Sequence, residues 1–150
     1  SARSQMAEAI LNHRGRGRFR AESAGSKPAA RVNPLAIEIL REHGLEWHGH
    51  APRTVDGLER EPWDFVITVC DRARESCPIF PGQPVLAHWG MEDRADAVGE
   101  EAAKQAFREV YVLLARRIDL LLALPVESLE RLALTAKLKA IGQSDQVISP

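Results

Sequence analysis

The sequence predicts a three-layer α/β domain built on a central parallel sheet. Residues 65–69, Phe-Val-Ile-Thr-Val, form an apolar run that is typical of a strand buried on both faces of such a sheet. Earlier in the chain, Asn33 is a good helix N-cap and Pro34 suits the first helical position, so a helix begins there. Helical and strand-like segments thus alternate, which is the pattern of parallel strands joined by helices.

Each remaining element is predicted from hydrophobic spacing and from the residues that end it. Gly15 and Gly17 end the first helix, and Gly44 ends the second. In chain order we expect a helix at 4–13, a strand at 18–23, a helix at 34–43, strands at 64–70 and 84–88, and helices at 99–124 and 127–141.

This order begins with a helix, although a strand in front of it would restore βαβαβ alternation and a four-stranded parallel sheet. The chain starts at Ser1 without an initiator Met, so we interpret it as a truncated chain whose first strand is absent. That strand would be central, at the switch point where parallel sheets bind ligands. We therefore expect the functional site close to the start of this chain.

Length and composition limit the function classes. The 150 residues suit a single domain at 1–142 followed by a tail at 143–150. The 20 basic and 21 acidic residues nearly balance, which argues against nucleic-acid or membrane partners. No apolar run reaches the roughly 18 residues of a membrane span. The two cysteines favour a reducing cytosol and a redox-active pair, so we expect a cytoplasmic protein.

Residues 1–4, Ser-Ala-Arg-Ser, form a candidate anion site at the start of the first helix. A helix N-terminus presents N–H groups and the positive end of its dipole. Arg3 can add a bidentate fork to a tetrahedral oxyanion, and Ser4 can hydrogen-bond the loop or a nucleophile. We therefore assign Ser1, Ala2, Arg3 and Ser4 to oxyanion binding, although an Arg-Ser pair at a chain start is most often a solvated end.

Three further residues are candidates for catalysis. Cys70 ends a buried strand, and Cys77 follows it in a loop. They could be one inert and one incidental thiol, but active sites of α/β proteins form at strand ends, which favours a functional pair. Asp93 follows the strand at 84–88 and could protonate a leaving oxygen, or it could be an N-cap or loop acid. No Cys/His spacing indicates zinc, so no metal site is predicted.

Together these residues closely resemble the thioredoxin-coupled arsenate reductases, which are relatives of the low-molecular-weight tyrosine phosphatases. The resemblance covers about residues 1–120 and implies a flavodoxin-like, phosphatase-like fold. In that family the spacing of Cys70 and Cys77 distinguishes reductases from phosphatases. The matching segments are Ser1-Ala2-Arg3-Ser4-Gln5-Met6-Ala7-Glu8, Ser23-Ala24-Gly25, Val32-Asn33-Pro34-Leu35-Ala36, Val69-Cys70-Asp71, Cys77-Pro78, His88-Trp89-Gly90 and Asp93.

The resemblance implies reduction of arsenate to arsenite by a thiol relay. A loop cysteine four residues before Ser1, absent from this chain, would attack arsenic while Arg3 holds the oxyanion and Asp93 supplies a proton. Cys70 would attack that cysteine, and Cys77 would then attack Cys70. Thioredoxin would reduce the resulting disulfide. No tightly bound cofactor is implied, and phosphate, sulfate or arsenate would occupy the anion loop.

Arg94 departs from the family pattern, because Pro usually follows the acid, and two other functions remain open. A phosphatase of phosphotyrosine or small phosphoesters would use the same loop and acid without Cys70 and Cys77. Its aromatic wall is lacking, since Tyr111 is the sole tyrosine. An inactive fragment that only binds anions also fits, because the attacking cysteine is absent. The chain alone is expected to be inactive, and the activity is expected of the full-length protein.

Overall fold

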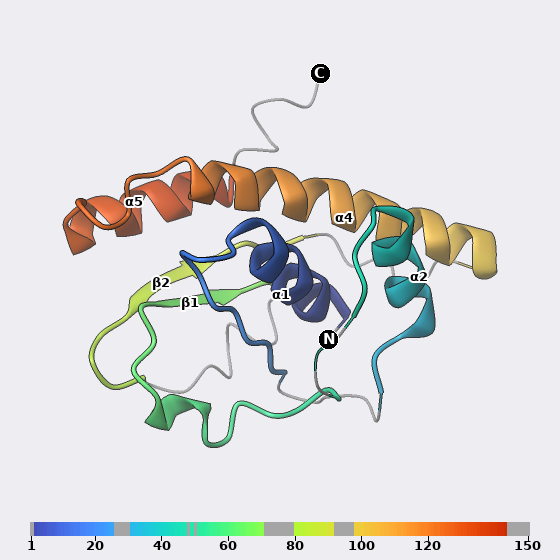
Figure 1. The fold of residues 1–150 in the computed structure, drawn as a ribbon, viewed down its shortest axis with the longest axis horizontal. Helices are drawn as coiled ribbons and strands as arrows, with labels where there is room; N and C mark the ends of the chain where they lie inside the picture. The colour runs from blue at the N-terminus through green and yellow to red at the C-terminus, as the bar shows by residue number, and fades with distance from the viewer. Residues whose placement is uncertain are drawn as a thin grey trace.

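The computed structural model shows an α/β arrangement of helices around a parallel pair of strands (Figure 1). It describes residues 2–25, 31–47, 49, 51–70, 80–91 and 98–143. The elements are α1 (Ala2–Arg14), α2 (Pro34–Glu42), the short 3-10 helix η1 (Leu58–Arg60), β1 (Phe65–Thr68), β2 (Val85–His88), α4 (Glu100–Leu122) and α5 (Arg131–Ile141).

The sheet confirms the predicted parallel arrangement. β1 and β2 pair in parallel, with Phe65 opposite Val85 and Thr68 opposite His88. The pairing continues beyond the strands, because the Trp89 N–H donates to the Thr68 carbonyl at 2.7 Å. Two of the four expected strands thus lie among the described residues, and both carboxyl ends point to one edge of the sheet.

The strand predicted at 18–23 is not a strand in the structure. This segment is irregular, and the isolated bridge that follows it joins Gly25 to Thr54. Side chains of α1 hold it instead: the Asn12 amide bonds both backbone groups of Ala21, at 2.8 and 3.0 Å. The prediction was wrong because an alternating segment forms a strand only where a neighbouring strand pairs with it.

The helices largely agree with the sequence. Asn33 caps α2, since its side-chain oxygen accepts the Leu35 N–H at 2.9 Å. The last helix starts later than predicted, because the chain turns at Pro125, whose carbonyl accepts the Ser128 N–H at 3.0 Å. Within the described part of the chain, no helix is long and apolar enough to cross a membrane.

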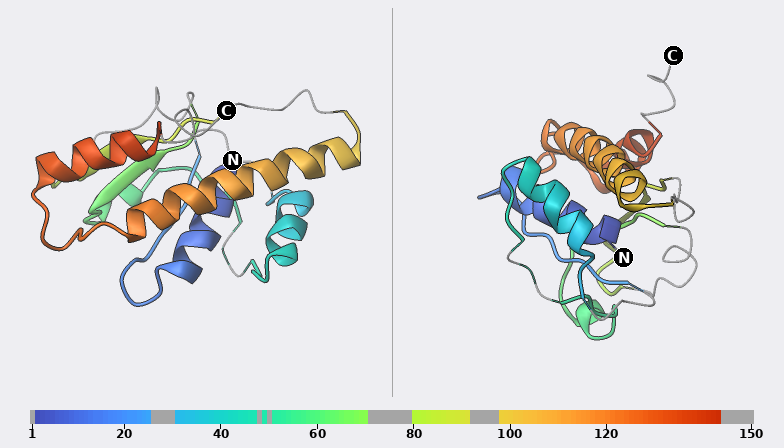
Figure 2. Two further views of the ribbon diagram at one scale, coloured as in Figure 1. Left: turned by 90° about the horizontal axis from the view of Figure 1, so that it is seen from above. Right: turned by 90° about the vertical axis from the view of Figure 1, so that its right-hand side faces the viewer.

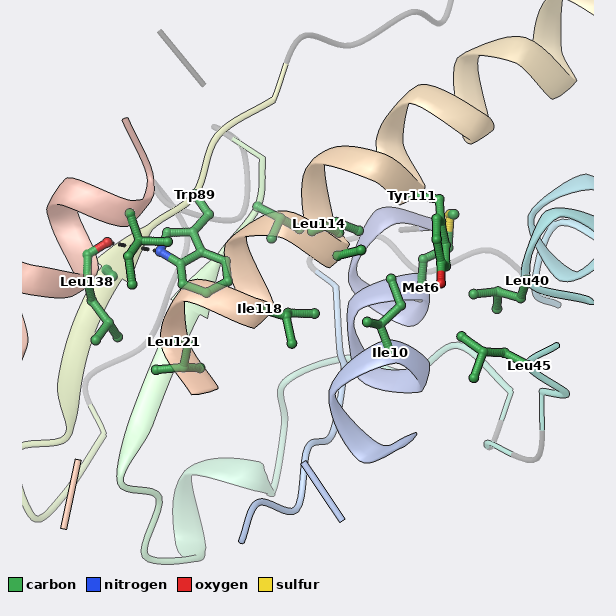
Figure 3. Close-up of a cluster of buried hydrophobic side chains, with 14 of the residues drawn as sticks. Met6, Ile10, Leu40, Leu45, Trp89, Tyr111, Leu114, Ile118, Leu121 and Leu138 are labelled. Atoms are coloured by element: carbon green, nitrogen blue, oxygen red, sulfur yellow. Dashed lines mark hydrogen bonds between the residues drawn. The ribbon is translucent and has the colours of Figure 1, made fainter. Parts of the chain in front are cut away.

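α4 is the central packing element. It runs along the molecule, with α2 beside its first half and α5 following its end (Figure 2). The buried side chains of α1, α2 and α5 meet the inner face of α4 in one continuous core (Figure 3). The labelled members of this core are Met6, Ile10, Leu40, Leu45, Trp89, Tyr111, Leu114, Ile118, Leu121 and Leu138.

Candidate functional site

Arg3 meets the chain that leaves β2. Its guanidinium Nη1 donates a hydrogen bond of 3.0 Å to the Met91 carbonyl, and this contact is partly buried. The contact brings the first turn of α1 to the carboxyl edge of the sheet, although the two segments are 88 residues apart in sequence. Met91 lies two residues before Asp93, which is outside the described residues.

The candidate anion-binding residues lie within α1 rather than before it. The helix begins at Ala2, two residues earlier than predicted, so Ala2, Arg3 and Ser4 form its first turn. The first N–H groups of a helix have no partner within the helix, and they carry the positive end of its dipole. An oxyanion at this end would meet both these groups and the Arg3 side chain. Ser1 lies outside the described residues.

Cys70 lies at the same edge of the sheet. It follows β1 by two residues, is half-buried and is not part of a disulfide. A side-chain hydrogen bond joins the two strands at this edge, because Thr68 Oγ1 on β1 and His88 Nδ1 on β2 are 2.7 Å apart. Parallel pairing therefore places Cys70 and Met91 at one edge, and the hydrogen bond to Met91 brings Arg3 to it. Cys77 lies outside the described residues.

Two buried charged side chains, one on α1 and one on α4, were not predicted from the sequence as site residues. Glu8 is 7% exposed and accepts hydrogen bonds from Ser23 N and Oγ at 2.7 and 2.9 Å. Arg117 is 1% exposed and donates to backbone carbonyls at the end of β2 and of α5. Helical spacing was the available signal, because Arg117 falls on the buried stripe that also holds Leu114 and Leu121.

A cavity of about 850 Å³ lies beside the site. The irregular segment 18–24 and β1 both line it, and α1 contributes Ser4, Ala7, Glu8 and Leu11. The cavity therefore extends from the first turn of α1 along the open edge of the sheet. Its walls are largely apolar side chains of α4, β1 and the loops that flank them, among them Phe19, Phe65, Ile67, Ile118 and Leu121.

The described residues offer no cluster of cation-binding side chains. Among the described residues, no group of three or more His, Cys, Asp or Glu side chains could hold a metal ion. At this edge, the described groups that could contact a ligand are the Arg3 guanidinium, the first N–H groups of α1 and the Cys70 thiol. Such a set suits a tetrahedral oxyanion and thiol chemistry.

Comparisons with known proteins agree with this geometry. Residues 1–123 match the family described as low molecular weight phosphotyrosine protein phosphatase. The arsenate reductase of Halalkalibacterium halodurans is 34% identical over 119 residues, which cover 79% of this chain and 85% of that protein. A solved arsenate reductase in the phosphate binding state has a TM-score of 0.66 at 29% identity, covering 81% of this chain and 88% of that one.

A third comparison is with a thioredoxin-dependent arsenate reductase of Corynebacterium glutamicum. Its TM-score is 0.62 at 30% identity, covering 80% of this chain and 54% of that one. The parallel sheet, the site edge and the match over residues 1–123 define the class: this chain belongs to the low molecular weight phosphotyrosine protein phosphatase family. Within that family it is similar to arsenate reductases in both sequence and structure, which confirms the resemblance seen in the sequence.

Proposed function

We propose that the full-length protein reduces arsenate to arsenite and is regenerated by thioredoxin. The observation that carries this proposal is the meeting of Arg3 with Met91 at the sheet edge where Cys70 lies. An arginine fork and a helix N-terminus suit the tetrahedral arsenate anion, and a nearby thiol suits its reduction. The similarity to reductases of this kind supports the same reaction.

In the proposed cycle, a thiolate from the loop before Ser1 forms a sulfur–arsenic bond, and one arsenate oxygen leaves with a proton from Asp93. The Cys70 thiolate attacks that sulfur, and the electron pair of the broken bond remains on arsenic, which departs as arsenite. Cys77 attacks Cys70 and releases the first cysteine as a thiolate. Thioredoxin then reduces the Cys70–Cys77 disulfide with two electrons and two protons.

The cavity supports a missing strand in front of Ser1. It is lined by segment 18–24 and by β1, and β1 pairs only with β2 among the described residues, so a further strand could pair with β1 there. Neighbouring strands are about 4.8 Å apart, so a strand paired with β1 would lie directly beside it, on the side that lines the cavity. Such a strand would deliver the attacking cysteine to the N-terminal end of α1. A thioredoxin-driven relay also needs a reducing compartment, so we place the protein in the cytoplasm.

A phosphatase is the second candidate, because the matching family carries that name. The surroundings of Tyr111 argue against a phosphotyrosine substrate. Its ring is 5% exposed and stacks on His43 with the ring centroids 3.7 Å apart, so it is packed in the core. It cannot line a substrate site while it is packed there, and a phosphatase would have no use for the two cysteines.

The test is an assay of the full-length protein with thioredoxin, thioredoxin reductase and NADPH. Arsenate-dependent oxidation of NADPH is expected, with none when thioredoxin is omitted. A parallel assay with p-nitrophenyl phosphate measures phosphatase activity. Hydrolysis of that ester without arsenate-dependent NADPH oxidation would overturn the proposal in favour of the phosphatase.

A further inference from the structure

Arg117 is an unusual residue for the centre of α4. It is 1% exposed and heads the largest fully buried side chains of the described residues. Its neighbours on the same helix face are Leu114, Ile118 and Leu121. Burying a guanidinium in such surroundings is unfavourable unless its N–H groups are hydrogen-bonded, so its partners indicate what it does there.

The Arg117 guanidinium joins two segments that are far apart in sequence. Nη1 donates to the Gly90 carbonyl at 3.1 Å, and Nη2 donates to the Gly142 carbonyl at 2.9 Å. Gly90 follows β2, and Gly142 is the C-cap of α5. One side chain of α4 therefore fixes the chain after β2 against the end of α5.

The next carbonyl in this chain holds the anion-site arginine. Gly90 accepts from Arg117, and Met91 accepts from Arg3 Nη1 at 3.0 Å. Two arginines from two helices thus hold successive carbonyls. Trp89 adds a third attachment, because its indole N–H donates to the Leu138 carbonyl at 3.0 Å (Figure 3).

Close packing at Gly90 leaves this short segment little freedom. A Cβ at position 90 would lie 2.7 Å from His88 Nε2, and a Cβ at Gly142 would lie 2.7 Å from the His88 carbonyl oxygen. The backbone from His88 to Met91 is therefore confined by β2, α5 and Arg117 together. A displacement of the Gly90 carbonyl would necessarily move the adjoining Met91 peptide.

We propose that Arg117 is a positioning residue for oxyanion binding, because it fixes the Gly90–Met91 backbone that in turn orients Arg3. The inference rests on the proposed function of Arg3. An arginine side chain has many rotamers, and holding Nη1 on a fixed carbonyl leaves its other N–H groups oriented for the anion. Loss of Arg117 should release that carbonyl and weaken anion binding without removing any group that touches the anion.

The test measures phosphate affinity of the full-length protein by isothermal titration calorimetry. Arg117→Met should weaken phosphate binding about tenfold, and Arg117→Lys should weaken it less, because one ammonium can reach one of the two carbonyls. Leu40→Ala is the matched control, since Leu40 is 1% exposed in α2 and lies outside this network. It should lower the melting temperature and leave phosphate affinity unchanged.

A double-mutant cycle separates positioning from a general structural effect. If Arg117 acts through Arg3, Arg117→Met should change phosphate affinity much less in an Arg3→Met background. Additive effects would overturn the inference, as would parent-like phosphate affinity in Arg117→Met. If Arg117→Met does not fold, parent-like affinity in Arg117→Lys overturns it equally. A parent protein that binds no phosphate would remove the proposed role of Arg3, and this inference with it.

Discussion

At the residue scale, the two cysteines give the sharpest prediction. In the full-length protein, Cys70→Ser should stall within the first turnover, with arsenic still attached to the first cysteine. Cys77→Ser should instead accumulate a disulfide between the first cysteine and Cys70. The reason is that each sulfur attacks the one before it, and a serine hydroxyl cannot replace the attacking thiolate. Intact-mass measurement and thiol counting after a single arsenate turnover distinguish the two products.

Phosphate binding is the control for these two cysteine variants. Both variants should bind phosphate like the parent, because neither substitution touches the guanidinium or the helix N–H groups. If both variants instead turn over with thioredoxin at the parent rate, the cysteine relay is wrong. The phosphatase would then be the better interpretation of the site.

Arg3 gives a second residue-scale prediction. Arg3→Lys should weaken oxyanion binding about tenfold, or about 1.4 kcal/mol, because an ammonium has no planar fork to hold the Met91 carbonyl and an oxyanion together. The change should appear mainly as a higher KM for arsenate in the coupled assay. Arg16→Lys, in the exposed turn after α1, is the matched control and should leave KM unchanged.

The position of the candidate site could be predicted from the sequence where the parallel pairing of strands determines it. Because their carboxyl ends meet at one edge, the sequence could place Cys70 near the chain after β2. Arg117 was not predicted as a site residue, because the apolar stripe of α4 predicts that the side chain is buried but does not identify the carbonyls that accept its hydrogen bonds. Its partners, Gly90 and Gly142, come from segments 27 and 25 residues away, and only the packed fold brings their carbonyls to it.

At the scale of elements, α2 is joined to α4 by two ion pairs. Arg108 binds both carboxylate oxygens of Glu42, at 3.0 and 3.1 Å, and Lys104 lies 3.0 Å from Glu38. The hydrogen bonds from Arg108 lower the pKa of Glu42 below its ordinary value of 4.5. A lowered pKa means that this pair stabilises the fold above pH 4.5, and that the stabilisation is lost as pH falls through the lowered value.

This linkage predicts the pH response of Glu42→Gln. Its melting temperature should be below the parent's at neutral pH. The gap should narrow as pH falls below 4.5 and close once pH is below the lowered pKa of Glu42, where the parent carboxylate is also neutralised. The gap should be small and should shrink in high salt, because the pair is exposed. Melting curves at several pH values measure it, and a gap that stays constant down to acidic pH would contradict the pairing.

The elements also show which structures a sequence pattern can predict and which it cannot. α2 was predicted well, because its cap and its first-turn proline act locally. Segment 18–23 was not, although its residues alternate as in a strand. The difference is physical: a helix forms its hydrogen bonds within itself, whereas a strand depends on a partner strand for every ladder bond. Here α1 binds the segment through Asn12 and Glu8 instead.

At the scale of the whole molecule, the cavity beside β1 predicts how stability depends on the segment proposed before Ser1. Among the described residues β1 pairs on one side only, and beside it lies a largely apolar cavity of about 850 Å³; a central strand would cover that edge and fill the cavity. The full-length protein should therefore melt cooperatively and well above chain 1–150, whose transition should be broad. Differential scanning calorimetry of both proteins, with a sedimentation measurement to detect dimers, makes the comparison.

A sharp, high transition of monomeric chain 1–150 would show that its edge needs no further strand. A sharp transition that depends on protein concentration would instead indicate that a second copy fills the cavity by domain swapping.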